Sequence, residues 1–377
     1  MAIDLHRCAV AGDPDDLLVD RIYPAPLRSE RTPFQRDRER IVQARAFRRL
    51  AGKTQVFTSR ASDHFRSRLT HTIEVAQIAR AAATALGLNE DLAETLALVH
   101  DIGHPPFGHA GEKALDESLQ AHGLGFDHNL HALRIVTWFE ERYAAFRGLN
   151  LTLAVREGIV KHSRDYSAID HPELAEYFLD QFPPLEAQLI DLADEIAYLT
   201  ADLDDGLDSG ILILDQVREG VPLFHRFHDA VLDQYPAAAQ KLTVNETLKR
   251  LLNLLVTDLI NETSSRVAEV GVAKLEDIRH APTRLVALSP QVESERAHAK
   301  QFLYASLYNS PGMEETHAHA AQVVQGLFAA LIADPAQLPA DHQAQIPTQG
   351  LARTVSDYIA GMTDSYIQQA WLRLSSK

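Results

Sequence analysis

The chain has 377 residues, 46% of them hydrophobic, which is enough for one large domain with extensions or for two domains. Its one cysteine, Cys8, excludes a disulfide framework and a zinc site built on cysteines. The first ten residues lack the pattern of a signal peptide, and no apolar run approaches the ~20 residues of a membrane span, so we expect a soluble cytoplasmic protein.

The net charge of −16 is distributed unevenly along the chain. Residues 28–68, the basic segment, hold twelve Lys or Arg and four Asp or Glu, so they carry +8 and the remainder carries −24. A basic segment in an acidic protein favours a confined polyanion, such as a phosphate chain, over general coating of nucleic acid. The alternative is a helix surface with local ion pairs, such as Arg36 with Glu39.

The apolar periodicity predicts helices along almost the whole chain. Residues 69–86 form the first strong pattern, with an apolar stripe from Ile73 to Leu86 that stops at Gly87. Runs of alternating β-branched residues with hairpin turns are missing, so an all-α fold is predicted. Further helices are expected at 185–203, 237–265, 293–309, 315–332 and 350–372, with breaks at 10–33, 203–222 and 333–349.

A second helix is expected directly after the first, with Asn89 as its N-cap. Pro105 and Pro106 end this helix, which leaves His100 and Asp101 in its last turn.

Several potential metal ligands lie where these helices can bring them together. His71 is near the start of the first helix, and His100 and Asp101 are at the end of the second, which runs antiparallel to it. Asp194 lies on the polar side of the helix at 185–203. Two imidazoles and two carboxylates suit a divalent metal with open positions, and by intrinsic affinity favour Mn, Fe, Co, Ni or Zn over Mg.

Other catalytic motifs are missing from the sequence. It has no HExxH for a zinc protease, no GxxxxGK phosphate loop, no GxGxxG that opens a βαβ unit and no GxSxG elbow of a serine hydrolase.

The sequence resembles the deoxyguanosinetriphosphate triphosphohydrolase-like proteins of bacteria, within the HD-domain phosphohydrolases. The resemblance rests on seven stretches that follow one another over most of the chain. They are RTPFQRDRERIVQARAFRRLAGKTQVF (31–57), SRLTHTIEVAQIAR (67–80), ALVHDIGHPPFGHAGE (97–112), GFDHN (125–129), REGIVKHS (156–163), LEAQLIDLADEIAYLTADLDDGL (185–207) and DYIAGMTD (357–364).

This resemblance implies a role for particular residues. It places the metal ligands at His71, His100, Asp101 and Asp194, and a catalytic His109 oriented by Glu112. The further site residues that it implies are His128 and Arg68 at the phosphates, Tyr198 and Asp202 at the sugar, Gln55 beside the sugar or base, and, less directly, Lys161 and His162.

The resemblance also implies an architecture and a reaction. The architecture is an HD-domain helical bundle, with an N-terminal arm at 1–30, a core with the basic segment at 31–215, and a helical C-terminal region at 216–377 packed on the core. The reaction is hydrolysis of a deoxynucleoside triphosphate to deoxynucleoside and inorganic triphosphate, with a divalent metal as cofactor. A homo-oligomer, tetramer or hexamer, is expected, and a nucleotide effector can bind between its subunits.

Alternatives remain open for single residues and for the whole chain. Arg68 could pair with Asp63 or Glu74, Tyr198 could be core packing, and His104 is expected to pin the turn rather than to touch substrate. The chain could act on another phosphoester, or bind single-stranded nucleic acid weakly through the basic segment.

Overall fold

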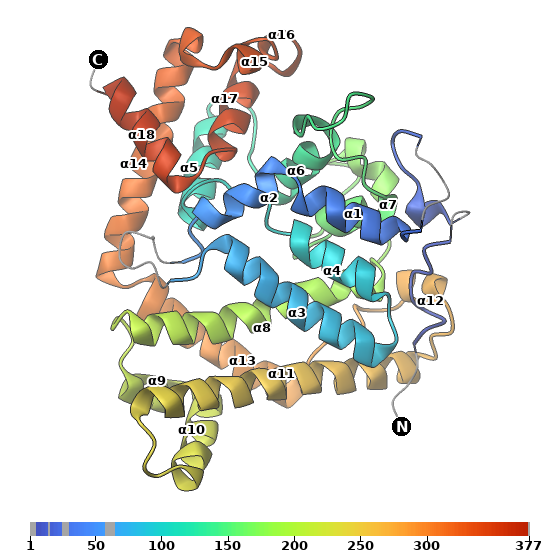
Figure 1. Cartoon of the computed structure of the whole chain (residues 1–377), viewed down its shortest axis with the longest axis vertical. Helices are drawn as coiled ribbons and strands as arrows, with labels where there is room; N and C mark the ends of the chain where they lie inside the picture. The colour runs from blue at the N-terminus through green and yellow to red at the C-terminus, as the bar shows by residue number, and fades with distance from the viewer. Residues whose placement is uncertain (1–4, 14–15, 25–29, 57–64, 376–377) are drawn as a thin grey trace. The chain divides into compact units, whose positions relative to one another are not determined.

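The computed structural model describes residues 5–13, 16–24, 30–56 and 65–375, and within these ranges it has helices and isolated β-bridges but no strand (Figure 1). The predicted all-α fold is confirmed. The helices of eight residues or more are α1 (Pro33–Val42), α3 (Arg68–Leu86), α4 (Glu90–Val99), α5 (Gly108–Gln120), α7 (Leu153–Val160), α8 (Leu185–Asp208), α10 (Pro222–Gln234), α11 (Gln240–Val270), α13 (Pro290–Leu303), α14 (Pro311–Ala333), α17 (Leu351–Ala360) and α18 (Asp364–Ser375).

The remaining helices are short connecting elements. They are α2 (Arg45–Arg49), α6 (His128–Arg134), α9 (Leu214–Gly220), α12 (Leu275–Arg279), α15 (Ala340–Gln343) and α16 (Ile346–Gln349). Four 3-10 turns lie at Leu17–Val19, Leu50–Gly52, Pro172–Tyr177 and Pro335–Gln337, and two π-helical turns extend α6 and α13 at Ile135–Phe139 and Tyr304–Tyr308.

The turn between α3 and α4 forms as the sequence predicts. Gly87 has a φ of 71°, a left-handed conformation that ends a helix without steric cost for glycine. The Asn89 Oδ1 then accepts the Leu92 N–H at 3.1 Å and caps α4. Helix α4 ends at Val99, so His100 lies just beyond the helix rather than in its last turn.

Two predicted boundaries are wrong. The stretch 350–372 is not one helix, because the chain leaves helical geometry between α17 and α18. Conversely, much of the predicted break at 203–222 is helical, since α8 continues to Asp208 and α9 follows. The glycine in this part of α8 permits close packing: a Cβ on Gly206 would lie 2.6 Å from the side chain of Leu212.

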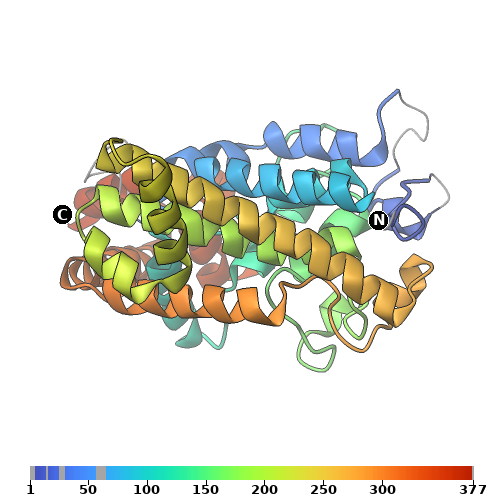
Figure 2. The same ribbon diagram turned by 90° about the horizontal axis from the view of Figure 1, so that it is seen from below.

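The described residues group into two compact units. The first unit takes the described residues up to Arg38, then 73–98 and 152–310; the second takes 39–72, 99–151 and 311–375 as far as described. In the first unit, the long helix α11 packs against α8 and α10 (Figure 2). The three-part division expected from the sequence stays a prediction.

The first unit buries most of the predicted apolar stripes. Leu86, Leu92, Leu189 and Ile196 are at most 3% exposed. Ile73, however, is 53% exposed, so its assignment to the apolar stripe of α3 is wrong. A side chain near the start of a helix can match the period of the apolar stripe and still lie where no other element covers the helix.

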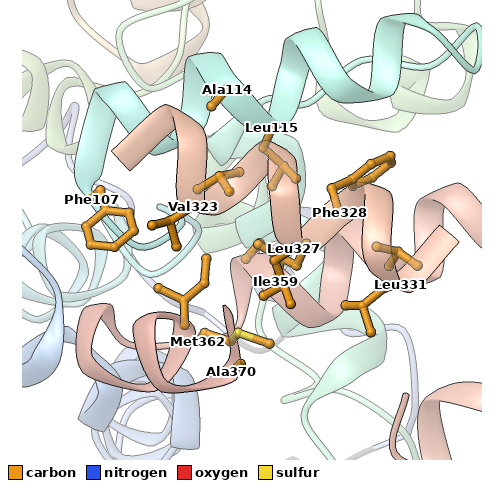
Figure 3. Packing of buried hydrophobic residues seen from close by; sticks show 14 of the residues in the cluster. Phe107, Ala114, Leu115, Val323, Leu327, Phe328, Leu331, Ile359, Met362 and Ala370 are labelled. Carbon is orange, nitrogen blue, oxygen red and sulfur yellow. The ribbon is translucent and has the colours of Figure 1, made fainter. Parts of the chain in front are cut away.

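The second unit has a core that joins α5 to the end of the chain. Leu115 of α5 and Phe107 just before it belong to one buried cluster with Val323 and Leu327 of α14, Ile359 of α17 and Ala370 of α18 (Figure 3). Helix α14 lies against α5, α17 and α18, so the C-terminal helices pack around the helix that carries His109.

A buried ion cluster in this unit ties α6 to α17. The Asp357 carboxylate, a member of the DYIAGMTD stretch, accepts a hydrogen bond from Nη2 of Arg134 at 2.7 Å, and its Oδ1 lies 3.4 Å from Nδ1 of His131. Burial acts to raise the pKa of Asp357, but the hydrogen bond and charge of His131, then Arg134, outweigh it and hold the pKa below its usual value. The carboxylate is therefore ionised in the folded protein at neutral pH.

We expect Asp357→Asn to lower the free energy of unfolding by about 2 kcal/mol at pH 7, because the partly buried Arg134 loses a charged hydrogen-bond partner and the buried His131 loses a neighbouring acceptor. The folded-state pKa is depressed, so the stabilisation is present above the ordinary aspartate pKa of about 3.9 and is lost as the pH falls below it. Urea unfolding at pH 7, 5 and 3.5 measures the difference in free energy of unfolding between wild type and variant. Glu117→Gln, an exposed change on α5, is the control. A difference that stays constant over this pH range would contradict an ionised, stabilising Asp357 carboxylate.

Candidate active site

The turn between α4 and α5 is built by residues that few others could replace. A Cβ on Gly103 would lie 1.9 Å from the His128 carbonyl oxygen, so only glycine permits this close approach to α6. Phe107, a non-glycine residue, has a φ of 64° and starts α5 from a left-handed conformation. The turn therefore fixes the backbone between His100 and His109.

The first cluster of ligand-type side chains is His71, His100 and Asp101, all at most 4% exposed. One potential ligand atom from each lies within 4.8 Å of the others, and the two imidazole centroids are 5.9 Å apart. Two imidazoles and a carboxylate that converge at this spacing form a mixed N/O set able to hold a divalent metal. The structure thus brings together three of the four residues predicted as ligands.

Arg68 lies against this cluster and is 2% exposed. Its Nη1 donates to Oδ2 of Asp101 at 2.9 Å. The sequence left Asp63 and Glu74 open as partners of Arg68. Asp63 lies outside the described residues, and the observed hydrogen bond of Arg68 is to Asp101. Burial acts to raise the pKa of Asp101, but the positive charge of Arg68 and the contacts with His104 and His100 together outweigh it, and the pKa is well below the usual value. The carboxylate is held in the ionised form that a metal ligand needs.

The second cluster is His104, His109, Glu112 and His128. Oε1 of Glu112 lies 2.8 Å from Nδ1 of His128 and also accepts the His128 backbone N–H at 3.1 Å. Oε2 of Glu112 lies 3.7 Å from Nδ1 of His109, whose side chain is 71% exposed. Glu112 is therefore held more closely by His128 than by His109, the partner predicted from the sequence.

The charge state of Glu112 follows from the same contacts. Burial acts to raise the pKa of this carboxyl group, but the hydrogen bonds of His109 and His128 outweigh burial and lower the pKa far below the usual value. An ionised Glu112 can orient both imidazoles at once and stabilise a proton on either.

His104 connects the two clusters. Its ring stacks on that of His128, with centroids 4.0 Å apart, and its Nδ1 lies 2.9 Å from Oδ1 of Asp101. Burial, then the charge of Arg68, hold the pKa of His104 well below the usual value, so the ring is neutral. Its one proton belongs on the nitrogen that faces the Asp101 carboxylate. His104 pins the turn, as predicted, and also links the two clusters.

Gln55 lies in the second unit, near the N-terminal end of the segment that leads to Arg68. Its Oε1 is buried and has no hydrogen-bond partner among the described residues. Its backbone carbonyl is close to the start of α5, 3.5 Å from where a Cβ on Gly108 would lie. The backbone of Gln55 is thus close in space to the turn that carries His109, and a buried side-chain acceptor without a partner suits a polar ligand group.

Three predicted site residues lie on α8, in the first unit: the ligand Asp194 and the sugar-binding Tyr198 and Asp202. A carboxylate oxygen of Asp194 and a ring nitrogen of His162 lie within 4.8 Å of each other. His162 is held by Asp191, whose Oδ1 lies 2.9 Å from its Nδ1. The assignment of Asp194 as a fourth metal ligand stays a prediction from the sequence.

The predicted sugar-binding pair is joined by a residue that the sequence reading missed. The hydroxyl of Tyr308 donates to Asp202, and its ring centroid is 5.9 Å from that of Tyr198. Burial, then the neighbouring Tyr198 and Asp202, raise the pKa of Tyr308 strongly, so it stays a hydroxyl donor. No local pattern marks Tyr308, which meets Asp202 from more than a hundred positions away.

Lys161 is placed in an internal polar network of the first unit. Its Nζ donates to Oε1 of Glu157 at 2.8 Å and to the carbonyl oxygens of Phe178 and Gln181 at 2.7 and 2.9 Å. Arg279 binds the same Glu157 through both of its terminal nitrogens. Since all three donors of the Lys161 ammonium have partners, we do not include it among the substrate contacts proposed below.

The clusters belong to a chain that matches known domains. Residues 68–199 match the HD domain and residues 286–373 match the phosphohydrolase-associated domain. The match to the HD domain begins at Arg68 and includes every member of the two clusters. The molecule is therefore an HD-domain protein.

Its relatives define the family more closely. The chain is 47% identical to a deoxyguanosinetriphosphate triphosphohydrolase-like protein of Thiobacillus denitrificans, with 94% of this chain and 93% of the relative covered. It is 46% identical to one of Azoarcus sp., covering 94% and 93%, and 45% identical to one of Bordetella pertussis, covering 97% and 95%. The chain belongs to the family of deoxyguanosinetriphosphate triphosphohydrolase-like proteins. None of its described helices is long and apolar enough to cross a membrane.

We expect His71→Ala to weaken the binding of Mn²⁺ by at least about 100-fold, because it removes one of three buried ligands that converge. The measurement is calorimetric titration of chelator-stripped protein with Mn²⁺, supported by elemental analysis after dialysis. His319→Ala, which changes an exposed histidine of α14, should bind Mn²⁺ as wild type does. Equal affinity of His71→Ala and wild type would show that the cluster does not hold the metal.

Proposed function

We propose that the chain hydrolyses deoxynucleoside triphosphates such as dGTP to the deoxynucleoside and inorganic triphosphate. The relatives carry the name of this activity, and the second unit holds two clusters of histidines and carboxylates that suit it. The observation that carries the proposal is the position of His104, which lies 2.9 Å from Asp101 and stacks on His128, because it places the Glu112–His128 pair beside a set of potential metal ligands.

The first cluster is the proposed metal site. His71, His100 and Asp101, with Asp194 as the predicted fourth ligand, would hold a divalent cation. When bound, the cation polarises a phosphoryl oxygen and lowers the pKa of water. Two imidazole ligands favour a transition metal such as Mn, Fe, Co, Ni or Zn over Mg.

The second cluster is the proposed acid–base site. The departing 5′-oxygen needs a proton, and His109 is exposed enough to meet a substrate there. The ionised Glu112 orients His109 and stabilises its protonated form. Glu112 also fixes Nδ1 of His128, so the other nitrogen of His128 is the one available to a phosphate oxygen.

The other substrate contacts are proposed from the resemblance together with their positions. Arg68 forms an ion pair with Asp101. Its guanidinium also lies close to the start of α5, because its Nη2 is 3.0 Å from where a Cβ on Gly108 would be. Phosphate groups therefore meet a guanidinium and a helix N-terminus close to each other. Gln55 offers its buried amide oxygen to the sugar or base. Tyr198 and Asp202 are proposed for sugar recognition, with Tyr308 holding Asp202 in place.

The assembly and the location of the protein are also proposals. The resemblance supports a homo-oligomer, tetramer or hexamer, with a nucleotide effector between subunits, and a cytoplasmic location. Light scattering of the purified protein with and without dGTP tests the assembly. Weak binding of single-stranded nucleic acid through the basic segment stays an alternative, and a titration at low ionic strength tests it.

We expect the chelator-stripped protein, reloaded with Mn²⁺, Co²⁺ or another divalent metal, to release triphosphate and no orthophosphate from at least one of the four common deoxynucleoside triphosphates. Attack at the α-phosphorus leaves the three phosphates joined, whereas stepwise attack at the γ-phosphorus would not. Ion chromatography of the products separates these outcomes. Orthophosphate as the first product would indicate a different phosphoester hydrolase, and activity that needs a second nucleotide would indicate an effector site.

We expect His109→Ala to lower kcat by about 10²- to 10⁴-fold, the range for loss of a general acid or base, with metal content unchanged. Steady-state kinetics with triphosphate detection measures the loss. Lys113→Ala, an exposed change one turn further along α5, is the matched control and should keep wild-type kcat.

A double variant separates the two partners of Glu112. If Glu112 acts only through His109, then Glu112→Gln adds no further loss to His109→Ala. Because Glu112 contacts His128 more closely, we expect the double variant to be slower than His109→Ala alone. Near-wild-type turnover of His109→Ala would exclude it as the acid or base.

A further inference from the structure

The carboxylate of Asp364, at the first residue of α18, reaches away from its own helix into the site. It is 8% exposed. Its Oδ1 accepts the backbone N–H of Phe107 at 2.9 Å. Its Oδ2 accepts the backbone N–H of Thr54 at 2.8 Å and a further hydrogen bond from the Thr54 hydroxyl. One side chain near the end of the chain thus holds two backbone segments that are far away in sequence.

Each of these segments leads directly to a proposed site residue. Phe107 precedes His109 by two positions, and its left-handed φ of 64° sets the direction in which α5 starts. Thr54 forms an isolated antiparallel bridge with Ser67, and the neighbouring Arg68 donates its N–H to the Lys53 carbonyl at 3.2 Å. Asp364 therefore binds the turn that carries His109 directly, and it reaches the segment that carries Arg68 through the pairing of residues 53 and 54 with residues 67 and 68.

The left-handed conformation of Phe107 needs such support. A bulky residue with positive φ is strained, and the strain persists only where surrounding groups determine the backbone. Here the N–H of Phe107 is bound by a carboxylate, and its ring packs in the cluster that includes Met362 (Figure 3). Without the hydrogen bond to Asp364, the backbone would be free to relax, and the imidazole of His109 would move with it.

A second brace from the same part of the chain holds the other end of the turn. Lys53, 3% exposed, donates from Nζ to the His104 carbonyl at 2.5 Å and to the Ala360 carbonyl at 2.9 Å. The amino group of Lys53 thus joins the backbone of the turn to the end of α17, within the second unit. Residues 360–364 therefore hold the turn at both His104 and Phe107.

We propose that Asp364 is a positioning residue, which fixes the turn 104–108 and the segment before Arg68 so that His109 and Arg68 meet the substrate in the right geometry. This inference rests on the proposed function for its catalytic consequence. The hydrogen bonds of Asp364 themselves do not depend on it.

The test is Asp364→Asn. Asparagine keeps one acceptor oxygen but places an NH₂ group against either the Phe107 N–H or the Thr54 N–H, so one of the two segments loses its partner. We expect kcat to fall by about 10- to 100-fold, the loss typical of a displacement of about 1 Å in a site, while KM changes by less than about threefold. Metal content should be that of wild type. Hydrogen exchange at the backbone amides of residues 104–109 should become faster.

The matched control is Glu140→Gln. Glu140 lies in the same unit, is 5% exposed, and accepts the Ala46 backbone N–H at 2.8 Å, away from the turn. The amide oxygen of glutamine is a weaker acceptor for the Ala46 N–H than the carboxylate, so the melting temperature should fall, but kcat and exchange at 104–109 should stay unchanged. If Asp364→Asn likewise lowers only the melting temperature, Asp364 is structural and the proposal is wrong.

A gentler variant keeps the proposal testable if Asp364→Asn does not fold. Thr54→Val has nearly the same shape and removes only the hydroxyl donor to Asp364. We expect a kcat about 3- to 10-fold below wild type, and an unchanged kcat would overturn the proposal. If wild type itself releases no triphosphate, the proposed function fails. Exchange at 104–109 then decides whether Asp364 holds the turn.

Discussion

The site depends on one buried carboxylate, that of Asp101. Its two oxygens contact Arg68 at 2.9 Å, His104 at 2.9 Å and His100 at 3.6 Å. A buried charge is tolerated only when it is paired and hydrogen-bonded, and each of these partners also contributes to the site. Arg68 helps to keep the carboxylate ionised, and His100 belongs with it to the first cluster. His104 contacts the carboxylate and stacks on His128 of the second cluster. Moving Asp101 would therefore disturb both clusters together.

Several of the described cations of the basic segment bind groups of the fold itself. Arg38 binds Asp91 at 3.1 Å and also Glu94, two acids that lie outside the segment. Lys53 binds carbonyl oxygens and Arg68 binds Asp101. Counting acids inside the segment underestimates such pairing, because tertiary contacts bring carboxylates from distant helices.

Local sequence was sufficient for the features that depend on local physics. The cap at Asn89 follows from short-range chemistry, and the meeting of His71 with His100 follows from helices joined by a tight turn. The exposure of Ile73, the preference of Glu112 for His128 and the role of Tyr308 could not be predicted in this way. Each of these depends on which distant surface covers a helix, and periodicity carries no such information.

The C-terminal helices complete the site although they hold none of its proposed reacting groups. Phe107 is fixed by Asp364 through its backbone and by the α14–α17–α18 core through its ring, so the strained start of α5 exists only once residues 311–375 have packed. The Asp357 carboxylate of α17 lies 3.4 Å from the imidazole of His131 in α6, three positions after His128. Asp357 and Asp364 belong to the stretch that matches the phosphohydrolase-associated domain. This stretch therefore supports the turn that follows His100 and Asp101 in the HD domain.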